Sequence, residues 1–203
     1  MSDQKLRELE RKWKETGSVE DEAAYLRERV RVGDLTQERL ELAAYCGQEA
    51  ARFATDCPDA ADSIGDMVQT ARDRWGKAEG IRLLIAISEE IAREYPGETA
   101  DFAPRVLDLA GRWLHCPCPT CARAGRDYAS RVAESLGNQG VSTTTDRRKR
   151  ARLTCLVLML LHSREDWSWH RSWIEDTLRE GEVAVSPAVV VRAKAAAASA
   201  ALA

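Results

Sequence analysis

Apolar residues along this chain recur with the 3.6-residue period of α-helices, and small or turn-forming residues separate successive segments. Ser18 and Asp21 form an approximate capping box at the start of one segment, and Gly33 ends it. Its apolar face consists of Val19, Ala23, Leu26 and Val30. A shorter segment opens at Thr36 and stops at Gly47. The pattern predicts two helices here, and we expect them to pair as a hairpin.

The same combination of apolar periodicity, helix caps and terminating glycines predicts helices along most of the remaining chain. Further helices are predicted over residues 64–75, 77–95, 99–113, 119–136, 146–163, 166–180 and 187–203. The stretch 48–62 is interrupted by polar residues and proline, so no helix is assigned to it. The second half of 146–163 is apolar nearly all round, which predicts a buried central helix.

No segment shows the strict alternation of a strand. The predicted fold class is therefore all-α, an irregular multi-helix bundle or short solenoid-like stack of about nine to ten antiparallel helices. We expect a single helical domain over residues 1–203. A soft subdivision into 1–137 and 146–203, joined by the polar loop 138–145, is compatible with the pattern.

Composition agrees with a packed helical chain. Of 203 residues, 44% are hydrophobic and 31% charged, and alanine, the best helix former, occurs 31 times. The formal net charge of −3 predicts no bulk attraction to nucleic acid or anionic lipid. The charged amino terminus lacks a signal-peptide pattern, and the longest apolar run has six residues, so we expect a cytoplasmic protein without membrane contact. Its six cysteines are then expected to be reduced.

The densest chemistry lies between two predicted helices, where His115, Cys116, Cys118 and Cys121 fall within seven residues. With Cys118 at the N-cap and proline at the first helical position, Cys121 falls three positions on, so both sulfurs face the free N–H groups of the first turn. Cys₃His is an accepted zinc ligand set. The sequence thus predicts zinc as a possible cofactor of this segment.

Three alternatives remain open for these residues. Zinc could take a fourth ligand from Cys155 or His162 on the predicted central helix instead of from His115. The pair Cys118 and Cys121 also forms a C-x-x-C at a helix start, which is typical of thiol redox sites. The third interpretation is simple packing, in which Cys121 is a small buried hydrophobe.

A basic segment follows the polar loop and begins the predicted helix 146–163. It consists of Arg147, Arg148, Lys149, Arg150 and Arg152. Cations at a helix amino terminus oppose the helix dipole, which favours a polyanionic partner such as nucleic acid, although intramolecular acids would also serve. No aromatic residues interleave with them, so a single-strand stacking surface is not indicated.

An aromatic cluster occupies the next predicted helix in a chain with only 6% aromatic residues. It consists of Trp167, Trp169, Arg171 and Trp173. Tryptophan and arginine are the residues that anchor protein interfaces most often, so this face is a candidate surface for another protein. Core packing with arginine stacking is the alternative.

The segment 17–51, GSVEDEAAYLRERVRVGDLTQERLELAAYCGQEAA, resembles a helical-hairpin unit of uncharacterised Arg- and Ala-rich proteins of myxobacterial type. It is also similar to the helix pairs of HEAT and tetratricopeptide modules, although the tetratricopeptide Trp-Leu-Gly-Tyr pattern is absent. The resemblance covers about a sixth of the chain. It implies an interaction-type helical domain and carries over no catalytic residue.

Motifs of hydrolases, kinases, nucleotide-binding proteins and zinc proteases are absent, so no catalytic residue is assigned. The leading hypothesis is a non-enzymatic protein-protein interaction or adaptor module that acts through helix faces. One alternative is a small zinc- or thiol-dependent regulatory domain centred on Cys116, Cys118 and Cys121. Another is a nucleic-acid-associated factor that uses the basic segment from Arg147 to Arg152.

Overall fold

The computed structural model of the chain describes residues 2–55, 61–94, 103–138 and 187–203. In these ranges it contains nine α-helices and no strand, which confirms the predicted all-α class. The helices are α1 (Ser2–Thr16), α2 (Val19–Val32), α3 (Gln37–Tyr45), α4 (Glu49–Ala54), α5 (Ile64–Trp75), α6 (Lys77–Glu94), α8 (Ala103–His115), α9 (Pro119–Asn138) and α12 (Pro187–Leu202). None of them combines the length and hydropathy that a bilayer-spanning segment needs.

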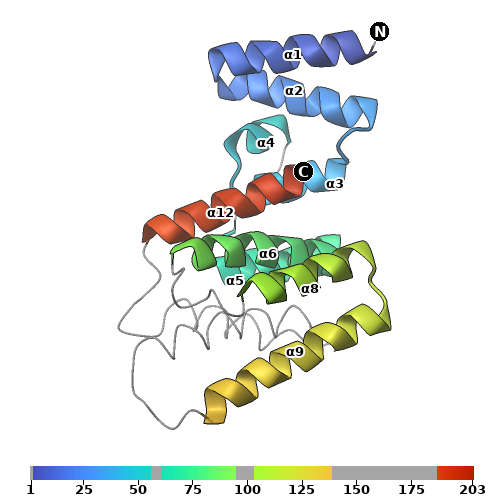
Figure 1. Cartoon of the computed structure of the whole chain (residues 1–203). Coiled ribbons are helices and arrows are strands. Elements are labelled where there is room, and N and C mark those ends of the chain that lie inside the picture. Colours follow the sequence, from blue (N-terminus) through green and yellow to red (C-terminus); the bar gives the residue numbers. More distant parts are fainter. Residues whose placement is uncertain (1, 56–60, 95–102, 139–186) are drawn as a thin grey trace.

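The described helices stack along one long direction, from α1 at one end to α9 at the other (Figure 1). Helix α2 packs between α1 and α4, and α3 packs against α4 and α12. Helix α6 contacts α12, α5 and α8, whereas α9 packs mainly on α8. Among the described helices, α1 and α9 at the two ends of this stack each have fewer helix partners than α6 in its middle.

Local signals determine where several helices begin and end. The Ser18 hydroxyl accepts a hydrogen bond from the backbone N–H of Asp21 at 3.1 Å, and Gly33 ends α2 in the left-handed region with φ +80°. Thr36 caps α3 in the same manner, through the N–H of Arg39 at 3.3 Å. These two starts were predicted from the sequence, and the structure confirms them.

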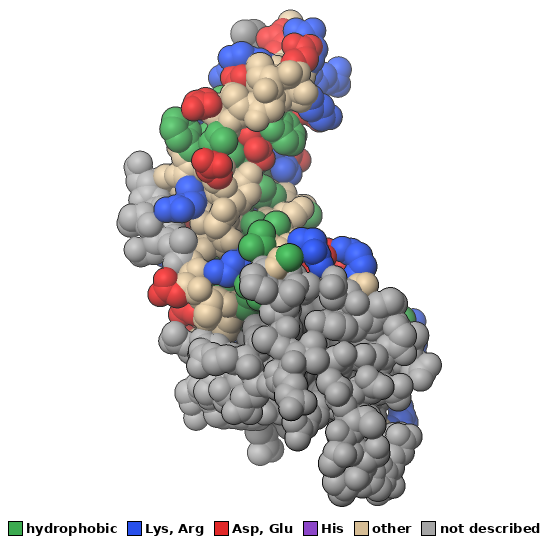
Figure 2. Space-filling model, turned by 90° about the vertical axis from the view of Figure 1, so that its left-hand side faces the viewer, with side chains coloured by type: hydrophobic (Ala, Val, Ile, Leu, Met, Phe, Trp, Pro, Cys, Tyr) green, Lys and Arg blue, Asp and Glu red, His purple; other side chains and the backbone are tan. Residues whose placement is uncertain are grey.

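Ion pairs hold the end of the stack that α1 and α2 form. The carboxylate of Glu28 on α2 is buried and accepts hydrogen bonds from Lys5 at 3.0 Å and from Arg31 at 2.5 and 2.9 Å. The Arg31 hydrogen bonds, with help from Lys5, lower the pKa of Glu28 to about 2. On the face shown in Figure 2, basic and acidic side chains are interspersed over this end, with hydrophobic ones between them. No large patch of a single charge sign covers this part of the visible face.

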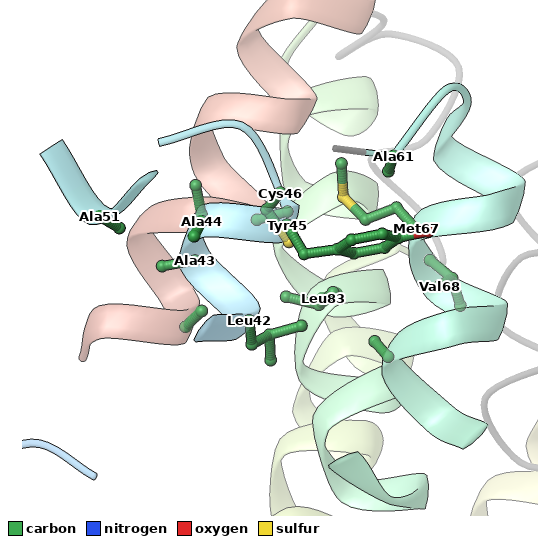
Figure 3. Packing of buried hydrophobic residues seen from close by; sticks show 14 of the residues in the cluster. Leu42, Ala43, Ala44, Tyr45, Cys46, Ala51, Ala61, Met67, Val68 and Leu83 are labelled. Carbon is green, nitrogen blue, oxygen red and sulfur yellow. The ribbon is translucent and has the colours of Figure 1, made fainter. Parts of the chain in front are cut away.

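The core lies where α3, α5, α6 and α12 meet. Figure 3 shows Tyr45 and Cys46, at the end of α3, pointing toward Met67 of α5. The Tyr45 hydroxyl lies 2.7 Å from the Asp66 carboxylate, so the polar end of this side chain is satisfied while its ring is buried. On α6 the sequence predicted one apolar stripe, but Leu83 and Ile87 are also fully buried. Helix α6 is buried over more of its circumference than predicted because it has neighbours on three sides.

Helix α12 joins regions that are far apart in the sequence. Its buried positions are alanines, Ala193, Ala197, Ala198 and Ala201. Because alanine side chains are short, α12 lies between α3 and α6 without displacing their larger side chains. The Lys194 ammonium donates to the carbonyls of Ala61 and Asp62 at 3.1 and 3.2 Å, which ties α12 to the start of the α5 region. The C-terminal helix thus shares one core with the N-terminal half.

Two expectations about the N-terminal region were wrong. Helices α2 and α3 hardly contact each other, so they do not form the predicted hairpin; α2 pairs with α1 and α4 instead. The reason is α4, a short helix in the stretch 48–62, to which no helix was assigned. Helix α4 lies between α2 and α3, and its buried Ala50 and Ala51 allow it to pack closely against both.

The predicted helices 146–163 and 166–180 and the polar loop from residue 139 lie outside the described residues.

Candidate metal centre

The turn between α8 and α9 is short and tightly bonded. The backbone N–H of Cys116 donates to the carbonyl of Arg112 at 2.9 Å, which completes the last turn of α8. The N–H of Cys118 then donates to the carbonyl of Cys116 at 2.7 Å, so the chain reverses in a three-residue turn around Pro117. Two prolines therefore restrict a turn that contains two of the three cysteines.

Cys118 is the N-cap of α9. Its carbonyl accepts the first helical hydrogen bond, from Ala122 at 3.1 Å, and its sulfur accepts one from the backbone N–H of Cys121 at 3.5 Å. Pro119 occupies the first helical position, where its missing N–H leaves no helical hydrogen bond unmade. This arrangement agrees with the one predicted from the sequence.

Three sulfur atoms gather at this turn. Those of Cys116, Cys118 and Cys121 all lie within 4.8 Å of one another, and this is the group of potential metal ligands found among the described residues. Cys116 is exposed, and the other two are half-buried, so ions can reach the sulfurs from solvent. His115, the last residue of α8, is exposed and is not part of this close group.

The thiols of Cys118 and Cys121 differ in acidity. Hydrogen bonds lower the pKa of Cys118 to about 7, first from the backbone N–H of Cys121 and then from the thiols of Cys116 and Cys121. The pKa of Cys121 rises to about 11, mainly because its thiol donates to the Cys118 sulfur. Cys118 is thus the more acidic thiol of this pair and Cys121 the less acidic one.

Cys46 occupies the opposite kind of environment. It is 3% exposed within the core, and burial raises the pKa of its thiol to about 12. It packs as a small apolar side chain within the core cluster. Cys57 and Cys155, together with His162, lie outside the described residues.

The other surfaces singled out in the sequence are also outside the described ranges. These are the basic segment, Arg147, Arg148, Lys149, Arg150 and Arg152, and the aromatic cluster, Trp167, Trp169, Arg171 and Trp173. Both remain predictions.

A surface feature that the sequence reading missed is centred on Phe53 of α4, which is 54% exposed. It lines a surface hollow of about 580 Å³ together with Val19, Glu20, Glu49 and Arg52. The Arg27 guanidinium lies 5.8 Å from the centre of the Phe53 ring and donates to the Phe53 carbonyl at 2.5 Å. No helix was assigned to this stretch, so Phe53 was not singled out from the sequence.

No family model, curated protein or solved structure matches this chain. The likeness of residues 17–51 to HEAT and tetratricopeptide helix pairs therefore stays a prediction. Among the described residues, the three clustered sulfurs are the clearest indication of a function.

Proposed function

We propose that this chain is a metal-dependent regulatory helical protein in which Cys116, Cys118 and Cys121 bind one thiophilic metal ion. The observation that carries the proposal is the separation of the three sulfurs, each within 4.8 Å of the others. Two sulfurs bound to one zinc ion at about 2.3 Å lie roughly 3.8 Å apart. Small side-chain rotations are therefore enough to bring all three sulfurs onto one ion.

The position of the cluster gives the ion a structural consequence. Cys116 follows the last residue of α8, whereas Cys118 and Cys121 belong to the first turn of α9. An ion bound to all three links the end of one helix to the start of the next. Since α9 packs mainly on α8 in the described part of the chain, the ion would fix the direction in which α9 leaves the stack. Metal binding and the orientation of α9 are then thermodynamically linked.

The test is metal analysis coupled to thermal unfolding. Purified protein without a metal-binding tag should bind one zinc per chain under reducing conditions, and zinc at a hundred times its Kd should raise the Tm by roughly 5–10 °C. Cys118→Ser and Cys121→Ser should each abolish both effects. Cys46→Ala, which removes a cysteine outside the cluster, is the matched control and should retain them. Equal zinc binding by the cluster variants and the wild type would refute the proposal.

A second candidate function is docking of another protein through the helix faces of the stack, as the sequence suggested. The Phe53 hollow favours it, because a half-exposed aromatic ring beside an arginine is typical of an interface anchor. Glu20, Glu49 and Arg52 line the hollow, so it offers charges of both signs beside an apolar contact.

Binding to a defined partner tests this candidate. Phe53→Ala should weaken the complex by at least about tenfold. Val191→Ala, which truncates the other exposed large hydrophobic residue of the described chain, should leave it unchanged. Equal effects of the two substitutions would remove the support for the hollow.

A further inference from the structure

We propose that the ion best suited to the cysteine cluster is monovalent copper, held by the three sulfurs in a trigonal arrangement. This inference rests on the proposed function, since it specifies which metal ion the cluster prefers. The first argument is the type of donor. Among the described residues, the close group contains three cysteine sulfurs and no imidazole or carboxylate. Sulfur-only sites favour soft ions, of which monovalent copper is the softest among the common biological metals.

The second argument is the number of donors. Structural zinc sites are nearly always tetrahedral with four protein ligands, and three residues alone leave one position to be filled from elsewhere. His115 is adjacent in sequence, yet its imidazole is not among the atoms within 4.8 Å. Monovalent copper is satisfied by three thiolates in one plane, which places the sulfurs about 4.0 Å apart if the metal–sulfur distance is about 2.3 Å, as for zinc. The observed grouping accommodates that geometry.

The third argument is the surroundings of the ion. A copper(I) ion with three thiolates carries a net charge of −2, and the backbone N–H of Cys121 in the first turn of α9, which donates to the Cys118 sulfur, stabilises that charge. Pro117 and Pro119 restrict the turn beforehand, which lowers the entropy lost when the sulfurs converge. Binding is a substitution without redox change, in which Cu⁺ replaces the thiol protons and these are released to solvent.

The experiment is an anaerobic competition between copper(I) and zinc on the reduced full-length chain, each buffered by a chelator of known affinity. We expect one copper(I) per chain to displace bound zinc, with a thiolate-to-copper absorption band in the ultraviolet. X-ray absorption at the copper edge should report three sulfur neighbours. Cys116→Ser should lower the affinity for copper(I) more than about 100-fold, which is a larger loss than the removal of a residue that only contacts a metal ligand causes. Cys46→Ala should leave the affinity unchanged.

Two results would overturn this inference in distinguishable ways. If zinc is retained against copper(I) and Cys155→Ser or His162→Ala weakens zinc binding, the cluster is part of a four-ligand zinc site. The proposed function then stands and the copper assignment fails. If neither ion binds stoichiometrically, or if both bind equally well to Cys118→Ser, the proposed function fails together with it.

Discussion

Cys46 follows α3 in the packed middle of the molecule, whereas Cys116, Cys118 and Cys121 surround the turn between α8 and α9. In the middle, neighbours from α5, α6 and α12 exclude water, and the thiol behaves as a small apolar group with a raised pKa. At the turn, backbone N–H groups and neighbouring sulfurs surround thiols that solvent can reach. A cysteine side chain thus contributes to stability in the packed middle and is available for chemistry at the turn. The neighbours of the thiol account for this difference.

The largest expected difference between the two regions is in thiol reactivity. The pKa of Cys46 rises from 9.0 to about 12, so its thiolate fraction near neutral pH falls roughly 1,000-fold. Iodoacetamide should therefore modify Cys118 of the native protein, whose pKa is lowered to about 7, at least about 1,000-fold faster than Cys46. Peptide mass spectrometry over a time course measures this ratio. Comparable rates in the native protein would contradict the comparison, and equal rates in denaturant are the control.

The next effect concerns the packing of the middle region. Leu83 on α6 is fully buried, and Leu83→Ala should lower the free energy of unfolding by about 2–5 kcal/mol through lost burial and a cavity. Leu114, near the end of α8, is only partly buried, so Leu114→Ala should cost clearly less. Urea denaturation of both variants gives the comparison. A larger loss at Leu114 would mean that the junction, and not the middle, is the stability centre.

A third prediction tests whether α12 belongs to the middle region. Ala197 has no exposed surface, so Ala197→Leu should overpack the contact with its neighbours and cost about 1–3 kcal/mol. Ala195 is exposed on the same helix, and Ala195→Leu should change the free energy of unfolding by less than about 0.5 kcal/mol. Equal effects in urea denaturation would show that α12 does not pack as described.

The smallest effect is expected at the cluster itself in the absence of metal. Serine is a preferred N-cap residue, so Cys118→Ser should keep the cap of α9 and shift the Tm of the metal-free protein by no more than about 2 °C. Calorimetry with a chelator present measures this shift. A large loss of stability without metal would show that Cys118 contributes through packing and not as a metal ligand.

Local features of the sequence were enough to predict much of both regions. Caps and glycines located the starts of α2 and α3 and the end of α2, and the prolines placed Cys118 at the start of α9, because these signals act within a few residues. The position of α12 was not predictable in this way. Lys194 bonds to Ala61 across 133 residues, and helical periodicity contains no information about which distant helix fills a groove. The short helix α4 was missed because its length gives too little periodicity to detect.

For the candidate site, proximity in sequence predicted proximity in space. Three cysteines within six residues can hardly lie far apart, and the turn around Pro117 brings their sulfurs together. What the sequence could not decide was whether His115 joins them, since that depends on the direction in which the last turn of α8 points its side chain. The Phe53 hollow depends on how α4 packs beside α2, which is a tertiary property.

The most direct test of the metal-binding account is the mapping of cysteine alkylation with and without one equivalent of copper(I) or zinc. The metal should protect Cys116, Cys118 and Cys121 together, while the alkylation of Cys46 stays slow with and without metal. Protection of one of the three alone, or of none, would contradict the claim that they form a single ligand set.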